Sequence, residues 1–204
     1  MSYLISRKIP IKIFWESNET EELESRRLIL QKGRMESIQH IILKILAYCY
    51  FWERNLVIEP HFRLNRFKPD LIAWRKPEIP AQEKLVPDLW IECKHVKLKK
   101  LRKLSRILPF SQIVWIHSKQ SLARTLKNIQ SMKKSMHLSS NVHLIGIETS
   151  EANWESLKDS IHVKKLQWGV CRHSKDRMEI SVREERSDIP ISLVFHTLPA
   201  TIKT

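Results

Sequence analysis

The stretch Pro87-Asp-Leu-Trp-Ile-Glu-Cys-Lys-His95 carries the pattern from which the fold is predicted. It is rich in β-forming residues and follows a proline-containing segment, so we expect a strand over residues 85–94. Alternate side chains of a strand point to the same face. One face of this strand would therefore carry Asp88, Trp90, Glu92 and Lys94.

A preceding strand is expected over residues 66–74, and the connection at 75–84 contains two prolines, as a long hairpin loop does. Folding the hairpin about its middle places Asp70 beside Glu92. Two carboxylates and Lys94 would then meet at one end of the hairpin. Carboxylate oxygens suit Mg²⁺, and a lysine beside them can orient an attacking water.

The elements around the hairpin predict an α/β fold with a mixed central sheet. Residues 34–148 follow the order helix, three strands, helix, strand (αβββαβ). We expect one domain over 1–204, in which this core is extended by β-rich segments at 1–33 and 149–204. The expected helices are 34–52, 97–108, 119–136 and 151–159, and the expected strands are 9–15, 56–64, 66–74, 85–94, 112–117, 142–148, 161–171, 177–183 and 191–196.

The charge of the chain is concentrated in one segment. The 204 residues carry 36 Lys and Arg against 22 Asp and Glu, a formal net charge of +14. Between Glu92 and Glu148 there is no acidic residue but there are twelve basic ones. A localised basic field suits a nucleic acid, although a solvated set of helix faces is the alternative interpretation. The residues expected to contact phosphates are Lys97, Lys99, Lys100, Arg102, Lys103, Arg106, Arg124 and Lys127.

Composition excludes several classes of protein. A hydrophobic content of 42% is too high for a disordered basic tail. No apolar run reaches the roughly 18 residues that span a bilayer, so we expect no membrane partner. The start of the chain lacks the features of a signal peptide. Three cysteines without framework spacing indicate a reducing, cytoplasmic setting.

The two predicted strands also resemble a known signature. Pro69-Asp70, twenty-one residues, and then Glu92-Cys93-Lys94 match the spacing of the PD-(D/E)xK nuclease superfamily. That resemblance implies a restriction-endonuclease-like core. In that superfamily an acidic residue on the first helix often joins the metal site, and Glu36 occupies this place here.

A closer resemblance, over about residues 9–195, is to the YaeQ-like proteins, a branch of that superfamily. The chain departs from them at one informative point. Many YaeQ-like proteins have Glu-Val-Gly-Gln-Pro where this chain has Glu92-Cys93-Lys94, which is closer to the pattern of active superfamily members. The segments that carry the resemblance are Glu36-Ser-Ile-Gln-His-Ile-Ile-Leu-Lys-Ile-Leu-Ala47, Pro69-Asp-Leu71, Leu89-Trp-Ile-Glu92, Lys99-Lys-Leu-Arg-Lys103, Ile113-Val-Trp-Ile116, Val142-His-Leu-Ile-Gly-Ile147 and Leu166-Gln-Trp168.

The resemblance implies hydrolysis of nucleic acid, DNA rather than RNA, with Mg²⁺ or Mn²⁺. Asp70, Glu92 and the Cys93 carbonyl would hold the metal, Glu36 would assist, and Lys94 would orient the nucleophile. A homodimer, surface loops or a partner would have to supply specificity. Two other functions stay open: a catalytically inactive nucleic-acid-binding module or subunit of a nucleoprotein assembly, and a scaffold for an acidic protein.

Overall fold

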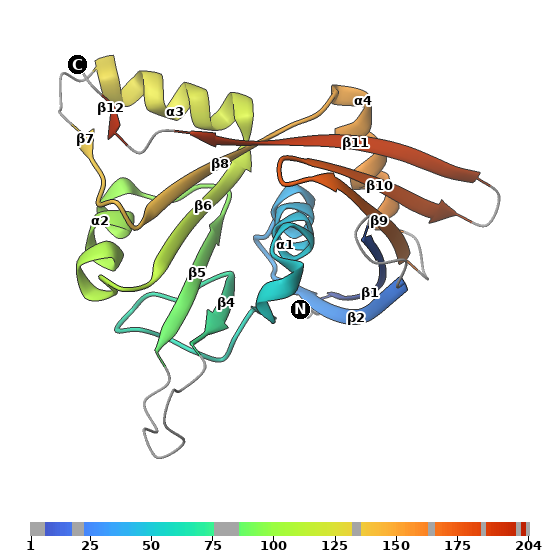
Figure 1. Ribbon diagram of the computed structural model, residues 1–204, viewed down its shortest axis with the longest axis horizontal. Helices are drawn as coiled ribbons and strands as arrows, with labels where there is room; N and C mark the ends of the chain where they lie inside the picture. The colour runs from blue at the N-terminus through green and yellow to red at the C-terminus, as the bar shows by residue number, and fades with distance from the viewer. Residues whose placement is uncertain are drawn as a thin grey trace, which may run out of the picture. The chain divides into compact units, whose positions relative to one another are not determined.

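The computed structural model describes residues 7–17, 23–75, 86–131, 136–162, 166–184, 187–198 and 201–202. The chain divides into two compact units (Figure 1). The first unit contains residues 1–49 and 148–195, and the second contains 50–147 and 196–204. The predicted core, 34–148, ends at the boundary between the second unit and the second segment of the first unit. The first helix of that predicted core belongs to the first unit.

In the first unit the strands are hydrogen-bonded neighbours in the order β2-β1-β9-β10-β11. The β1 strand is antiparallel to β2 and parallel to β9, and β10 is antiparallel to both β9 and β11. The elements of this unit are β1 (Arg7–Ser17), β2 (Leu23–Lys32), α1 (Ile38–Tyr50), α4 (Glu151–Ser160), β9 (Leu166–Ser174), β10 (Arg177–Glu184) and β11 (Ser187–Leu198).

The β2 strand has no counterpart among the predicted elements. It lies at the edge of the sheet and, apart from Leu30, its side chains are exposed or partly exposed. Charged residues can therefore occupy both of its faces, and the alternation that marks a half-buried strand is weak. Its pairing with β1, in which Ile11 lies opposite Leu28, defines it instead.

Helix α1 begins at Ile38, four residues later than predicted. The backbone N–H of Glu36 donates to the Gly33 carbonyl at 3.1 Å, which forms a turn before the helix. The Ser37 hydroxyl then accepts from the N–H of His40 at 3.2 Å. A serine that caps a free N–H in this way is a typical helix start. From Ile41 to Tyr50 every residue of α1 is buried.

The second unit contains a mixed sheet in the order β8-β6-β5-β4-β3. Strands β5, β6 and β8 are parallel, and β4 is antiparallel to β3 and β5 (Figure 1). Helices α2 and α3 make the crossovers between the parallel strands. The elements are a short 3₁₀ turn (Trp52–Arg54), β3 (Val57–Ile58), β4 (Leu71–Trp74), β5 (Pro87–Cys93), α2 (Leu98–Ile107), β6 (Gln112–Ser118), α3 (Lys119–Ser131) and β8 (Val142–Glu148), with β7 (Met136–His137) paired to β12 (Thr201–Ile202).

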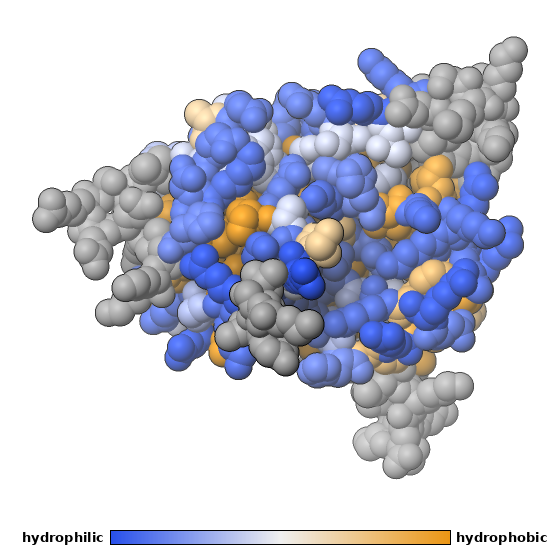
Figure 2. All heavy atoms as spheres, turned by 180° about the vertical axis from the view of Figure 1, so that it is seen from behind, coloured by the Kyte–Doolittle hydropathy of each residue, from blue (hydrophilic) through white to orange (hydrophobic). Residues whose placement is uncertain are grey.

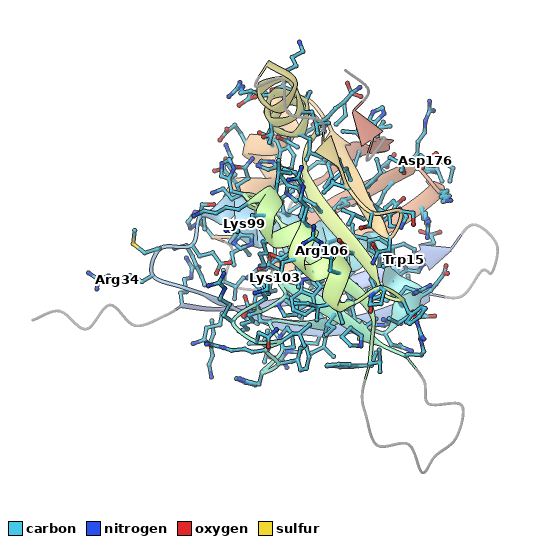
Figure 3. The ribbon with its side chains drawn as sticks, turned by 90° about the vertical axis from the view of Figure 1, so that its left-hand side faces the viewer. Trp15, Arg34, Lys99, Lys103, Arg106 and Asp176 are labelled. Atoms are coloured by element: carbon cyan, nitrogen blue, oxygen red, sulfur yellow. The ribbon has the colours of Figure 1, made fainter. Side chains whose placement is uncertain are left out.

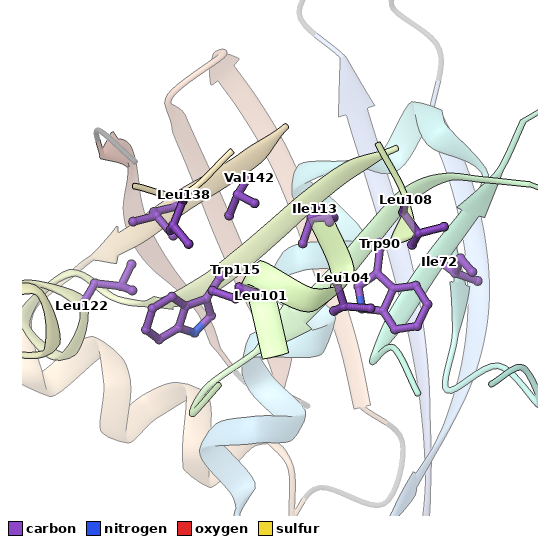
Figure 4. Packing of buried hydrophobic residues seen from close by; sticks show 11 residues of the cluster. Ile72, Trp90, Leu101, Leu104, Leu108, Ile113, Trp115, Leu122, Leu138 and Val142 are labelled. Carbon is purple, nitrogen blue, oxygen red and sulfur yellow. The ribbon is translucent and has the colours of Figure 1, made fainter. Parts of the chain in front are cut away.

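One hydrophobic cluster joins the helices to the sheet of the second unit. Figure 4 shows Trp90 on β5 and Trp115 on β6 packed with Leu101 and Leu104 of α2 and Leu122 of α3. Both tryptophans are at most 1% exposed and so lie in the core. The cluster fixes the face of β5 that lies against α2, and Glu92 is two residues beyond Trp90 on that face.

The predicted α/β class is confirmed, and the order α1-β3-β4-β5-α2-β6 is the predicted one. Strands β3 and β4 are much shorter than predicted. Glu59, with a backbone φ of 51°, and Pro60 end β3, and a tight turn joins Leu64 to Phe67 before β4. The predicted hairpin loop at 75–84 falls, except for Arg75, outside the described residues.

One face of the molecule is largely polar. The face in Figure 2 consists mostly of hydrophilic residues, with apolar residues in separate spots. In the described part of the chain, no helix is long and apolar enough to span a membrane. The large apolar side chains that the structure exposes are Leu23, Ile29, Met35, Val57, Val86 and Phe110.

Candidate functional site

Asp70 and Glu92 are brought together at one end of the β4–β5 pair. Leu71 lies opposite Ile91 in the ladder, so the preceding Asp70 falls next to Glu92. The backbone N–H of Asp70 donates to the Ile91 carbonyl at 3.0 Å, and its Oδ2 accepts from the N–H of Cys93 at 2.7 Å. The hairpin register predicted from the sequence therefore holds to within one residue.

Glu92 is a buried carboxylate with a cation against it. Its side chain is 5% exposed, and Oε1 accepts from Trp90 Nε1 at 2.7 Å and from Lys100 Nζ at 2.5 Å. Burial raises the pKa of Glu92, the charge and hydrogen bonds of Lys100 and Trp90 oppose this, and the nearby Asp70 carboxylate raises the pKa further. The ionised form of Glu92 thus depends on a neighbouring cation.

Lys94 lies just beyond the end of β5, where the backbone leaves the strand. Its N–H donates to the Ile116 carbonyl at 2.9 Å, and its own carbonyl accepts from Trp115 Nε1. Its φ of 66° is left-handed, which is uncommon for a residue with a Cβ. Side-chain alternation stops at such a turn, so the shared face predicted for Glu92 and Lys94 does not follow from the strand period.

We expect Lys94→Gly to be more stable than Lys94→Ala by about 1 kcal/mol. Both variants lose the amine, but glycine adopts the left-handed backbone without the steric cost that alanine retains. The greater freedom of glycine in the unfolded chain reduces the difference. Urea unfolding of both variants measures it. If the alanine variant were the more stable one, the left-handed conformation at residue 94 would be wrong.

Lys100, rather than Lys94, is the lysine that the structure places on Glu92. It lies in the first turn of α2, the helix that covers the cluster face of β5. From the sequence Lys100 is predicted to bind phosphate, because its charge belongs to the run of basic residues in this helix. The contact of Lys100 with Glu92 could have been inferred from the order of the elements. A right-handed crossover helix starts above the end of the strand that precedes it, so the first turn of α2 falls near the end of β5.

The oxygen atoms at this site fit a hard cation. Mg²⁺ takes oxygen ligands and is commonly held by one or two carboxylates with several waters. Asp70 and Glu92 supply the carboxylates, and Cys93, whose N–H is bound to Asp70, has a carbonyl next to them in the chain. Within the described residues, no group of three His, Cys, Asp or Glu side chains is arranged to hold a metal ion.

Glu36 belongs to the first unit, where its carboxylate is held by three groups. Oε1 accepts from Lys44 Nζ at 2.6 Å and lies 2.9 Å from His40 Nδ1, and Oε2 accepts from the N–H of Gly33 at 3.0 Å. Burial acts to raise the pKa of Glu36, but the hydrogen bonds from His40, Lys44 and Gly33 outweigh it and lower the pKa to about 2. Its predicted role at the metal stays a prediction.

Glu36 should stabilise the fold above pH 4.5, its ordinary pKa, and lose this effect as the pH falls toward 2. The lowered pKa corresponds to roughly 3 kcal/mol, which solvent screening reduces to about 2 kcal/mol. We expect Glu36→Gln to be less stable than the parent protein by this amount near neutral pH, with the difference shrinking in acid. Urea unfolding at several pH values measures it. A difference independent of pH would contradict the ion pair with Lys44.

The predicted phosphate-binding residues of α2, apart from Lys100, lie on its exposed side. Figure 3 shows Lys99, Lys103 and Arg106 along the helix on the side that faces the viewer. Leu101 and Leu104 lie on the opposite, buried side. Of the eight residues, Lys100 is partly buried against Glu92, and the exposed ones are Lys97, Lys99, Arg102, Lys103, Arg106, Arg124 and Lys127.

Comparison with known proteins shows a shared fold. No protein-family model matches the sequence, and no curated protein matches it significantly. The YaeQ protein from Xanthomonas axonopodis pv. citri has a similar structure, with a TM-score of 0.64 and 14% sequence identity over 95% of this chain and 99% of that one. The YaeQ protein from Pseudomonas syringae gives a TM-score of 0.61 and 13% identity, over 96% and 98%. The predicted YaeQ-like fold is thus confirmed.

Proposed function

We propose that the second unit binds nucleic acid, DNA rather than RNA, and hydrolyses its phosphodiester bonds with Mg²⁺ or Mn²⁺. The observation that carries this proposal is the contact of Asp70 with the end of β5, which sets it beside Glu92 at the start of a basic helix. The YaeQ-like fold and the order of elements support the assignment to the PD-(D/E)xK superfamily with its restriction-endonuclease-like core.

Each residue of the site has a separate task in this proposal. Asp70, Glu92 and the Cys93 carbonyl would hold the cation, which when bound would stabilise negative charge on the phosphate. Lys94 orients the attacking water. Lys100 neutralises Glu92, so the buried carboxylate stays ionised. The exposed cations of α2 bind the nucleic-acid backbone.

One observation favours a second candidate, a nucleic-acid-binding module without hydrolytic activity. Lys100 Nζ lies 2.5 Å from Glu92 and already neutralises the carboxylate on which a metal would depend. In such a protein the pair would be structural, and the basic helix alone would bind nucleic acid. The chain would then act as a subunit of a nucleoprotein assembly.

Incubation with labelled DNA and RNA in Mg²⁺, Mn²⁺ or a chelator tests the two candidates. A nuclease hydrolyses at least one substrate with a metal present, and the chelator abolishes hydrolysis. A binding module shows salt-sensitive binding that the chelator leaves unchanged. If no DNA or RNA is cut with either metal, the proposal of a nuclease is wrong. Light scattering of the same samples shows whether a homodimer forms.

A further inference from the structure

Three cations surround one aromatic ring next to the carboxylate pair. Around the ring centre of Phe67 lie the guanidinium carbon of Arg66 at 5.6 Å, Lys103 Nζ at 5.7 Å and Lys100 Nζ at 5.9 Å. We name this group, Phe67 with Arg66, Lys100 and Lys103, the Phe67 platform. Its members come from two segments, the turn before β4 and the helix α2. Phe67 and Arg66 are not among the site residues predicted from the sequence.

The position of the ring is set by the backbone. Leu64 and Phe67 exchange two hydrogen bonds, each of 2.9 Å, across a tight turn whose tip residue, Asn65, has a φ of 54°. The ring is partly buried against the hydrophobic cluster and partly open to solvent. The turn and the hydrophobic cluster together set where the ring lies.

The positive charge of the platform favours the binding of an anion. In the described part of the chain, Arg66 and Lys103 form no ion pair with a carboxylate, and only Lys100 does, with Glu92. The flanking residues Arg63 and Lys68 are also basic and exposed. Like charges held around one ring repel each other, and a phosphate between them would remove that repulsion.

We propose that the Phe67 platform binds single-stranded nucleic acid, with a base against the open part of the Phe67 ring and phosphates on Arg66 and Lys103. Aromatic rings between cations bind single strands in this way, whereas the bases of a duplex are stacked on each other and closed to a side chain. The inference deepens the proposed function, on which it rests, because Lys100 contacts both the ring and Glu92. A strand on the platform would lie next to the carboxylate pair.

Fluorescence anisotropy in a chelator tests this binding separately from hydrolysis. The probes are a labelled single strand of about 15 nucleotides and its duplex. We expect the parent protein to bind the single strand at least tenfold more tightly than the duplex. Phe67→Leu should weaken single-strand binding by about tenfold, since it removes one stacked base. Phe67→Trp should retain binding.

Phe110→Leu is the matched control, because it makes the same change at a phenylalanine that is 81% exposed just beyond α2. It should bind like the parent protein. The double variant Arg66→Ala/Lys103→Ala should lower the slope of log affinity against log salt by about 1.4, since a single-strand contact contributes about 0.7. Circular dichroism confirms that each variant is folded.

Equal single-strand binding by Phe67→Leu and the parent protein, or duplex binding as tight as single-strand binding, would overturn the inference. Hydrolysis is measured on the same variants with Mg²⁺. Binding that depends on Phe67 without any hydrolysis would leave the platform in place and refute the nuclease. Hydrolysis of duplex DNA at the same rate by the Phe67 variants and the parent protein would support the nuclease and refute the platform.

Discussion

Asp70→Asn is expected to lower metal-dependent hydrolysis by at least about 100-fold while the protein stays folded and still binds nucleic acid. The substitution removes the charge of one proposed metal ligand, and losses of this size are typical when an electrostatic contact to the reacting group is removed. An asparagine oxygen can still accept the hydrogen bond that Cys93 N–H donates to Asp70 at 2.7 Å. The end of β5 should therefore keep its structure.

Asp88→Asn provides the matched control for this change. Asp88 is on β5, the strand that carries Glu92, but it is paired with Arg54 at 2.5 Å and with Arg75 at 3.8 Å. The Asp88→Asn variant loses the same charge at a position away from the carboxylate pair. Its rate of hydrolysis should therefore stay within a few-fold of the rate of the parent protein. Initial rates on a labelled oligonucleotide in Mg²⁺ compare the three proteins. Equal rates for Asp70→Asn and the parent would remove Asp70 from the reaction.

Lys100→Met is expected to lower the free energy of unfolding by about 2–3 kcal/mol near neutral pH. Breaking a buried ion pair leaves an uncompensated charge and typically costs about 3–5 kcal/mol, reduced here because the Lys100 side chain is 24% exposed. Without Lys100, the burial that raises the pKa of Glu92 acts with less opposition. Urea unfolding gives the measurement.

Two comparisons separate this effect from a general loss of packing. Lys103→Met makes the same change on the exposed side of α2 and should cost less than about 0.5 kcal/mol. Glu92→Gln/Lys100→Met removes both charges and should recover part of the loss.

A further measurement concerns the metal: if Mg²⁺ binds at Glu92, it should stabilise Lys100→Met more than the parent protein. Equal stability of Lys100→Met and Lys103→Met would show that the ion pair contributes nothing.

The core of the second unit could be predicted because its signals are local. The proline-bounded strands and their period of two place Asp70 next to Glu92, and the leucines of α2 identify its buried side. The β2 strand could not be predicted in the same way, since as an edge strand its identity comes from pairing with β1. Tertiary pairing of this kind leaves little trace in a single sequence.

Only part of the candidate site could be predicted from the sequence, because its other contacts depend on tertiary structure. The carboxylate pair follows from the hairpin, but the contact between Lys100 and Glu92 depends on how α2 crosses β5, and the left-handed backbone at Lys94 has no sequence signal comparable to a glycine. Glu36, His40 and Lys44 are spaced at four residues, one helical turn. That spacing also suits an ion-paired cluster within the first unit, which is what the structure shows for them.

If Asp70 and Glu92 form a site for a divalent cation, Mn²⁺ binding measured by electron paramagnetic resonance should depend on Asp70. We expect the parent protein and Asp88→Asn to bind one Mn²⁺ ion with similar affinity. Asp70→Asn should bind the ion at least about tenfold more weakly, because one of two carboxylate ligands is lost. Equal Mn²⁺ affinity for Asp70→Asn and Asp88→Asn, or no binding by the parent protein, would contradict this assignment.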